Sequence, residues 1–175
     1  MAAAMAAAAA GLVRRLAVAG VRGQPARASS GDAGWKDVLA GARWARPGTE
    51  MSDVVFVQTG FGCDQHGTAG ANKAVKRACR NAIEFNALPY MEQIMKDAGL
   101  AGREDMLLAV KVGVPADLVA SVDVEAVRAS FPYGRMLPVD VVAGGLDFAS
   151  GRVVAALGDK KDRAVVAVVA VTVGK

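Results

Sequence analysis

The residues best suited to chemistry lie together in one short stretch, Gly60-Phe61-Gly62-Cys63-Asp64-Gln65-His66-Gly67. It holds a carboxylic acid, a thiol and the only histidine of the chain, interspersed with three glycines. Asp64 and His66 stand two residues apart, so in an extended loop their side chains can point the same way. A carboxylate can orient an imidazole and raise its basicity, which suits a general base near neutral pH. The sequence therefore predicts Asp64 and His66 as catalytic acid–base residues.

Other interpretations of the same residues remain open. Asp64 and His66 could be two ligands of a divalent metal, with a third from Glu84 or Asp140. One histidine and few neighbouring carboxylates make this the weaker alternative, and we expect no metal or cofactor. A structural alternative has Asp64 capping the following helix and His66 hydrogen-bonded inside the loop. Cys63 could act as a nucleophile beside His66, because an imidazolium favours the thiolate.

The stretch also resembles a family signature, the pattern G-x-G-x-D-x-H-G. Five positions match that pattern: Gly60, Gly62, Asp64, His66 and Gly67. In these residues the chain resembles a small family of conserved hypothetical proteins, found in bacteria and, with a long N-terminal prefix, in plants. The resemblance runs from about residue 52 to the C-terminus and implies no assigned biochemical function. Cys63 occupies a variable position of the pattern, which favours a structural role for this thiol.

The surroundings of the stretch predict a small polar or anionic ligand. The stretch follows an apolar run and precedes a helical pattern, and helix N-termini at the carboxyl edge of a sheet attract anions. Its glycine spacing fits neither the dinucleotide fingerprint nor a Walker loop. A lysine near the helix start and an arginine after the turn at residues 132–134 could both reach an anion. The predicted ligand-binding residues are Gly60, Gly62, Gly67, Lys73 and Arg135.

Composition and charge restrict the partners. The 175 residues are 53% hydrophobic and 22% charged, which suffices for a buried core. The net charge of +4 belongs to residues 1–50, where seven basic residues face three acidic ones, whereas the rest has 14 of each. A neutral domain is a poor nucleic-acid binder, and no apolar run reaches the roughly 18 residues of a membrane span. We therefore expect neither nucleic acid nor membrane as a partner.

The N-terminal region predicts an organelle transit peptide over residues 1–34. It is rich in alanine and arginine and has no acidic residue before Asp32. Because arginine is frequent and serine scarce, we expect the mitochondrion, with the chloroplast as the alternative. Residues 35–50 are predicted as a linker and residues 51–175 as a single compact domain.

Apolar periodicity predicts an α/β (or α+β) fold. Strands are expected at 53–58, 106–114 and 135–143, and a C-terminal hairpin at 153–157 and 163–173. Helices are expected at 71–86, 90–98 and 124–130. This order, β-α-β-α-β plus the hairpin, predicts one mixed sheet of about four to five strands with two main helices on one face.

The last strand raises the question of what covers the second face of the sheet. Residues 165–171 are apolar at both alternating positions, so both faces of this strand should be dry. The helices can cover one face only, and a homo-oligomer would cover the other. We expect an oligomeric enzyme that acts on a small metabolite as an isomerase, lyase or hydrolase. The alternative is a non-catalytic metabolite-binding or regulatory module that uses the same loop.

Overall fold

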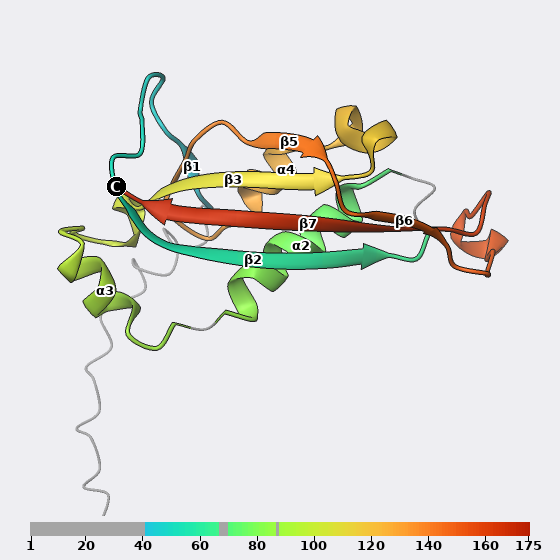
Figure 1. Ribbon diagram of the computed structural model, residues 1–175, viewed down its shortest axis with the longest axis horizontal. Coiled ribbons are helices and arrows are strands. Elements are labelled where there is room, and N and C mark those ends of the chain that lie inside the picture. The colour runs from blue at the N-terminus through green and yellow to red at the C-terminus, as the bar shows by residue number, and fades with distance from the viewer. Residues whose placement is uncertain (1–40, 67–69, 87) are drawn as a thin grey trace, which may run out of the picture. The chain divides into compact units, whose positions relative to one another are not determined.

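The computed structural model describes residues 41–66, 70–86 and 88–175, which build one mixed sheet with helices packed on it (Figure 1). The strands are β1 Arg43–Trp44, β2 Val54–Asp64, β3 Leu107–Val114, β4 Arg135–Met136, β5 Asp140–Ala143, β6 Leu146–Ala149 and β7 Arg163–Gly174. The α-helices are α2 Asn72–Glu84, α3 Met91–Asp97 and α4 Val124–Ala129. Short 3₁₀ turns are η2 Arg103–Asp105, η3 Ala116–Ser121 and η4 Ala155–Leu157.

Strand β7 is the longest strand of the sheet and pairs with three others. It pairs antiparallel with β2 along one edge and with β3 and then β6 along the other. Beyond β3 lie β4 and β5, which both run parallel to it, and β4 pairs in turn with β1. All strands other than β7 therefore run in one direction, so β2 and β3 end at the same edge of the sheet.

Helix α2 lies unusually close to β2 because small residues meet at the contact. Ala74, Ala78 and Ala82, spaced by one helical turn, are fully buried against the strand. A Cβ atom on Gly60 would lie 2.3 Å from the Ala82 nitrogen, and one on Gly62 would lie 2.3 Å from the Ala74 carbonyl oxygen. Only glycine permits this approach of two backbones.

The position of these two glycines corrects a sequence expectation. Residues 60–64 were expected to form a loop after a strand ending at residue 58, whereas β2 continues through Asp64. Gly60 and Gly62 are paired with Val169 and Ala167 of β7, and neither has a positive φ. Their physical role is close helix packing within the strand, so the turn begins only at Gln65.

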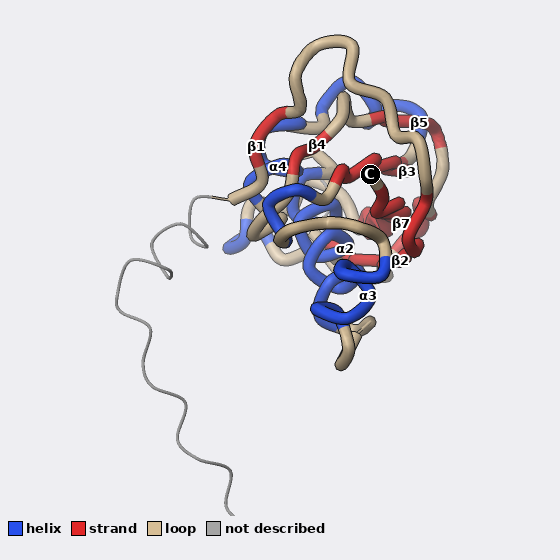
Figure 2. Tube along the Cα trace, turned by 90° about the vertical axis from the view of Figure 1, so that its left-hand side faces the viewer, coloured by secondary structure: helices blue, strands red, loops and turns tan. Residues whose placement is uncertain are grey.

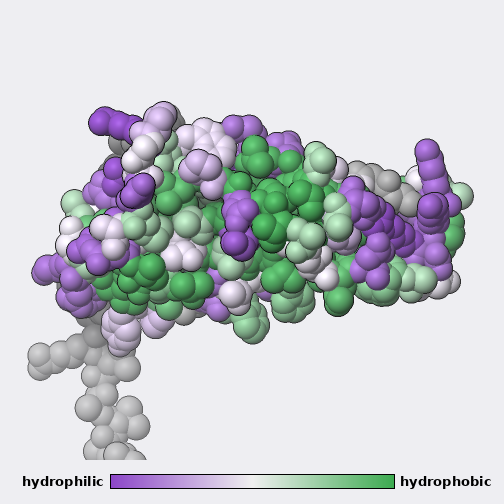
Figure 3. Space-filling model, turned by 45° about the horizontal axis from the view of Figure 1, so that its top comes forward, coloured by the Kyte–Doolittle hydropathy of each residue, from purple (hydrophilic) through white to green (hydrophobic). Residues whose placement is uncertain are grey.

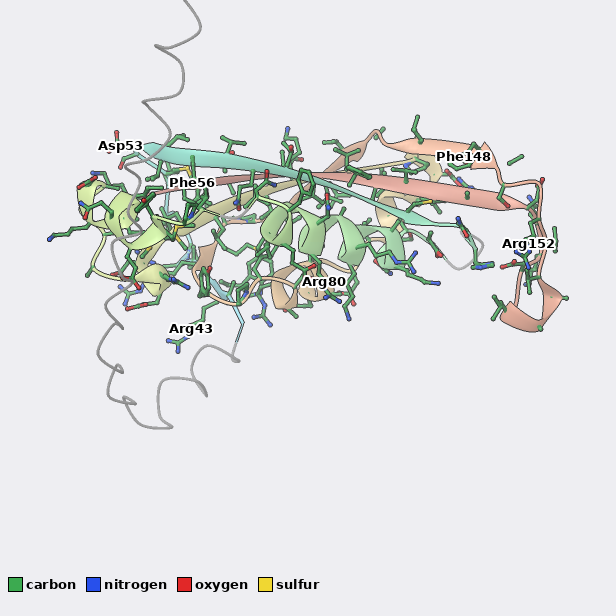
Figure 4. The ribbon with its side chains drawn as sticks, turned by 90° about the horizontal axis from the view of Figure 1, so that it is seen from below. Arg43, Asp53, Phe56, Arg80, Phe148 and Arg152 are labelled. Atoms are coloured by element: carbon green, nitrogen blue, oxygen red, sulfur yellow. The ribbon has the colours of Figure 1, made fainter. Side chains whose placement is uncertain are left out.

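The main helices pack on one face of the sheet and leave the opposite face bare. Figure 4 shows α2 and α4 below the strands, and the end-on view of Figure 2 shows them on one side of the β3–β7–β2 part. Hydrophobic residues gather on the molecular surface in the space-filling view of Figure 3. Cross-strand pairing joins the exposed face across β2, β7 and β6. We call it the bare face, and its apolar members are Val57, Phe61, Val166, Val168, Leu146 and Phe148.

Side chains of the segment around α2 cover part of the free edge of β2. The Phe61 amide donates to Asn81 Oδ1 at 3.1 Å, and Asn86 Nδ2 donates to the Thr59 carbonyl at 3.0 Å. The Arg77 guanidinium donates to the Cys63 carbonyl. Unpaired strand edges invite pairing with other chains, and these three contacts occupy such groups on residues 59, 61 and 63.

Two further differences concern the C-terminal half. The expectation of one mixed sheet is correct, but its seven strands exceed the predicted four to five. The segment 135–143 is divided into β4 and β5, with Pro138, which lacks a backbone donor, between them. The hairpin partner of β7 is β6, whereas residues 155–157 form a 3₁₀ turn. Gly145, with φ +67°, lets the chain move from β5 to a place beside β7, where a Cβ would lie 2.1 Å from the Val166 oxygen.

The N-terminal expectations are affected in part. Within the predicted linker, β1 joins the sheet and Ala42 is fully buried in the core, so part of this segment belongs to the fold. The predicted transit peptide lies outside the described residues. Within the described ranges, no helix is both long and apolar enough to cross a membrane.

Candidate functional site

His66 stands just past the carboxyl end of β2. The strand ends at Asp64, and Gln65 and His66 form the turn that follows. The Asp64 Oδ1 atom accepts a hydrogen bond from the His66 backbone N–H at 3.3 Å. The imidazole is half-buried, with 27% of its side chain exposed. The ring is therefore held near the surface while its backbone is fixed by the strand end.

The imidazole is oriented by Asp159, which lies 93 residues further along the chain. His66 Nδ1 lies 2.7 Å from Asp159 Oδ2, and the same oxygen accepts from the Val154 N–H at 2.9 Å. These two hydrogen bonds, the one from His66 being the stronger influence, hold the pKa of Asp159 below its ordinary value. The carboxylate is thus ionised and can only accept, so Nδ1 bears the proton. Nε2 remains as the nitrogen for a ligand.

Asp64 uses its carboxylate differently. Its Oδ1 lies 3.2 Å from Lys73 Nζ in the first turn of α2, and the Asp64 side chain is almost fully buried. Its contact with His66 is to the backbone, and the contact with the ring belongs to Asp159. The expectation that the Asp64 carboxylate orients the imidazole is therefore not met, because Asp64 contacts His66 through the main chain. A catalytic role for Asp64 stays a prediction.

The two carboxylates that contact His66 are buried. In the described part of the chain, Asp64 and Asp159 are the buried charged residues, and both contact His66. Buried carboxylates are costly unless paired. Asp159 Oδ1 is also buried and has no hydrogen-bond partner among the described residues. Two buried acids thus fix both the backbone and the ring of one half-exposed histidine.

A pocket of about 430 Å³ opens beside the imidazole. This volume suits a small metabolite. The pocket lies between the turn after β2, strand β6 and the loop that follows β6. Figure 4 shows Phe148 on β6 and Arg152 on that loop, at the end of the sheet. The lining residues are Gln65, His66, Phe148, Ser150, Arg152, Val154, Leu157 and Ala164.

With this geometry in place, similarity to known proteins defines the relatives of the chain. The family model described as "Conserved hypothetical protein (Lin0512_fam)" matches residues 54–173, which span β2 through nearly all of β7. The chain belongs to the Lin0512 family. This membership confirms the resemblance to a family of conserved hypothetical proteins.

A solved structure supports the fold of this Lin0512 family member. It is described as the crystal structure of an FtsZ-like protein of unknown function from Nostoc punctiforme. Its sequence is 38% identical, the match covers 71% of this chain and 97% of the other, and the TM-score is 0.61. No curated protein shows significant similarity to the chain.

The other residues predicted for the site are distributed unevenly in this Lin0512 protein. Lys73 lies at the site, paired with Asp64, whereas Gly60 and Gly62 are buried under α2. Arg135 begins β4 at the opposite end of the sheet, where its guanidinium donates to the Asp105 carbonyl at 2.8 Å. The structure therefore does not bring Arg135 to the pocket. Gly67 lies outside the described residues.

The alternatives to acid–base chemistry also have places in the structure. The described residues contain no group of three or more His, Cys, Asp or Glu side chains arranged for a metal ion. The two candidate third ligands are engaged elsewhere, Glu84 with Arg80 and Asp140 with Lys111. Cys63 is half-buried and does not line the pocket. Burial raises the pKa of the core thiol Cys79 to about 12, so it is unreactive.

Sequence reasoning missed two residues of this site, Asp159 and Arg152. Asp159 lies in a polar segment, Gly158-Asp159-Lys160-Lys161-Asp162, that was interpreted as a hairpin turn. No local pattern distinguishes its carboxylate from that of Asp162. Arg152 follows a strand that was not expected. The contact of Asp159 with the His66 ring and the position of Arg152 in the pocket lining both depend on tertiary structure.

Proposed function

We propose that this protein is a small enzyme in which His66 performs acid–base chemistry on a metabolite bound in the adjoining pocket. The observation that supports the proposal is that both buried carboxylates of the described chain hold this one half-exposed histidine. With the proton on Nδ1, the lone pair of Nε2 can take a proton from a substrate. The Asp159 carboxylate then stabilises the resulting imidazolium. Asp64 fixes the strand end and positions the histidine.

Isomerases, lyases and hydrolases all use such a base, and they differ in what the proton transfer accompanies. Isomerisation and elimination exchange a carbon-bound proton with solvent, whereas hydrolysis incorporates a solvent oxygen. Among the described residues that line the pocket, His66 is the one side chain suited to acid–base catalysis near neutral pH. The proposal therefore favours a reaction that a single proton-transferring group can support.

The experiment uses mass spectrometry of a metabolite extract incubated with the full chain in D₂O or in H₂¹⁸O. We expect at least one metabolite to gain deuterium or ¹⁸O, and His66→Asn to abolish that label. Removing a general base costs about 10²- to 10⁴-fold in rate. Lys76→Met, on the outer side of α2, is the control and should leave labelling unchanged. Labelling that persists in His66→Asn would overturn the proposal.

The second candidate is a metabolite-binding module. It is favoured by the same lining, because the cavity that His66 borders could hold a metabolite without converting it. In that case a metabolite raises the unfolding temperature of the wild type by mass action, and no label enters any metabolite. The two assays on one extract thus separate the candidates.

We further propose that a second copy of the chain covers the bare face. Phe61 and Leu146 are 68% and 63% exposed there, and Phe148 belongs both to this face and to the pocket. Strands β2, β7 and β6, with 11, 12 and 4 residues, give a projected area of about 440 Å². Because side chains protrude from the strands, the accessible area is larger than this projected area and approaches the roughly 800 Å² per partner of a stable interface. The covered edge of β2 favours face-to-face association over strand addition.

Light scattering of the full chain at micromolar concentration tests this self-association. We expect a mass above that of one chain for the wild type and dissociation for Phe61→Asp, which puts an unpaired charge into the interface. Phe85→Asp is the matched control, because Phe85 is 79% exposed at the end of α2, away from the bare face. A monomeric wild type would refute self-association through this face.

A further inference from the structure

The charges that line the pocket are one-sided. Among the described residues that line it, His66 and Arg152 are the charged or titratable ones, and none is a carboxylate. Arg152 has no carboxylate partner among the described residues, unlike Arg163, which binds both Asp117 and Asp147. Lys73, which lies near the site, is paired with Asp64. Among the described lining residues, Arg152 therefore carries a positive charge that has no ion-pair partner.

The backbone that presents Arg152 is fixed before any ligand arrives. Ser150 Oγ accepts from the Arg152 N–H at 3.3 Å and donates to the Arg152 carbonyl at 3.1 Å. Gly151 between them adopts φ +70°, and the Ser150 N–H donates to the Asp162 carbonyl. A turn held in this way limits the ordering that binding requires to the arginine side chain itself.

The remaining lining is mostly apolar. Phe148 and Leu157 border the cavity and are 47% and 65% exposed, and Val154 and Ala164 add further apolar surface. Such surface gains free energy when an apolar group covers it. Gln65 and Ser150 supply the polar lining besides the two cationic or titratable groups.

We propose that the pocket binds an organic monocarboxylate, with its carboxylate on the Arg152 guanidinium and its apolar body against Phe148 and Leu157. Guanidinium and carboxylate match in a bidentate, charge-assisted pair. The single guanidinium charge balances a monoanion, whereas a phosphate dianion would keep one negative charge unbalanced by Arg152. This inference names the substrate class of the proposed function and rests on it only for the reaction at His66.

His66 provides the measurement, because it is the only histidine of the chain and gives a single set of imidazole NMR signals. The probe is benzoate, titrated into the full chain, with benzamide as the neutral isostere and inorganic phosphate as the competing anion. We expect a saturable shift of the His66 signals with benzoate, and at least tenfold weaker binding of benzamide and of phosphate.

Variants assign the binding to the guanidinium. Arg152→Met should weaken benzoate binding at least tenfold, because a charged hydrogen-bonding partner is lost, and Arg152→Lys should lie between. Arg46→Met removes the same charge from an exposed position before β2 and should leave benzoate affinity unchanged. Equal affinity in Arg152→Met and wild type, tighter phosphate binding, or no saturable shift with benzoate would each overturn this inference.

The outcomes separate this inference from the proposed function. If benzoate binds through Arg152 while His66→Asn keeps the isotope labelling, the carboxylate site stands and the acid–base role falls. If His66→Asn abolishes labelling while Arg152→Met binds benzoate normally, the acid–base role stands and the carboxylate site falls.

Discussion

Asp64 and Asp159 are both buried and both contact His66, yet they differ in reach and in surroundings. Asp64 comes from two residues away, contacts the backbone and is neutralised by Lys73. Asp159 comes from the far end of the chain, contacts the ring and keeps one oxygen without a partner among the described residues. The nearby acid thus fixes the strand end, whereas the distant acid orients the imidazole through Nδ1.

The largest effect should come from Asp159→Asn. Without the carboxylate, Nδ1 loses its ionised acceptor and the imidazolium loses its counter-charge, so the labelling rate should fall by about 10²- to 10⁴-fold. The ¹⁵N shifts of the single imidazole should show the proton moving partly to Nε2. If Asp64→Asn reduced the rate as strongly and Asp159→Asn did not, the two roles would have to be exchanged.

A substitution in the part of β2 that packs against α2 should lower the stability of the protein. Gly62→Ala places a Cβ 2.3 Å from the Ala74 oxygen, and because both partners are backbone the cost should be about 3 kcal/mol in the free energy of unfolding. Gly113→Ala is the matched control, since its Cβ would meet no atom closer than 3.7 Å. Urea denaturation measures both. Equal stabilities would mean that α2 does not lie as close to β2 as described.

Asp64→Asn should have a smaller effect. The amide oxygen can still accept from the His66 N–H, and the loss of the charge partner of the half-exposed Lys73 should cost about 1 kcal/mol. A double-mutant cycle with Lys73→Met isolates the pair. A loss well above that value, with a normal labelling rate, would make Asp64 purely structural.

Lowering the pH should weaken the contributions of the buried Asp159 and of the exposed Asp117 to stability in the same direction, although their partners differ. The pKa values of Asp159 and of Asp117, which is bound by Arg163, both lie below their ordinary value of 3.8 in the folded protein. The stabilisation from each carboxylate is therefore complete above about pH 3.8 and is lost as the pH falls through the lower folded pKa. Urea denaturation between pH 2 and 6 should show the difference between wild type and Asp159→Asn shrinking with acid.

The stability difference between wild type and Asp117→Asn should also shrink as the pH falls. In an Arg163→Met background, the difference caused by Asp117→Asn should no longer depend on pH in this way, whereas the difference caused by Asp159→Asn should keep its pH dependence. A wild type whose advantage over Asp159→Asn grew as the pH fell would contradict the hydrogen bonds that lower the pKa of Asp159.

The main helix and strand could be predicted from the local apolar pattern, whereas the continuation of β2 through Asp64 and the short strand β1 could not. The apolar stripe of α2 and the alternation in β3 predicted both elements to within two residues at each end. Gly60 and Gly62 were interpreted as a loop, because glycine usually breaks a strand. Their partners Ala74 and Ala78, four residues apart, were the available signal for close packing. The two-residue β1 is too short for any periodicity.

The candidate site was predicted where its residues are local. The place of His66 at the carboxyl edge of the sheet was expected from the order of strand, polar stretch and helix, although the strand was expected to end at residue 58. Arg135 was misplaced because it begins its strand and so lies at the amino edge, opposite the carboxyl edge where β2 ends. The contact of Asp159 with the ring depends on a fold-wide pairing of β2 with β7, which no local spacing reveals.

The covered edge of β2 has a consequence for how the protein fails. The asparagine and arginine side chains that occupy this edge come from α2 and the residues just after it, so detachment of α2 would free the edge. Aggregation by strand addition is then governed by an opening equilibrium rather than by the native surface. The alanine–glycine contact that holds α2 in place thereby also contributes to the resistance of the folded protein to aggregation in concentrated solution.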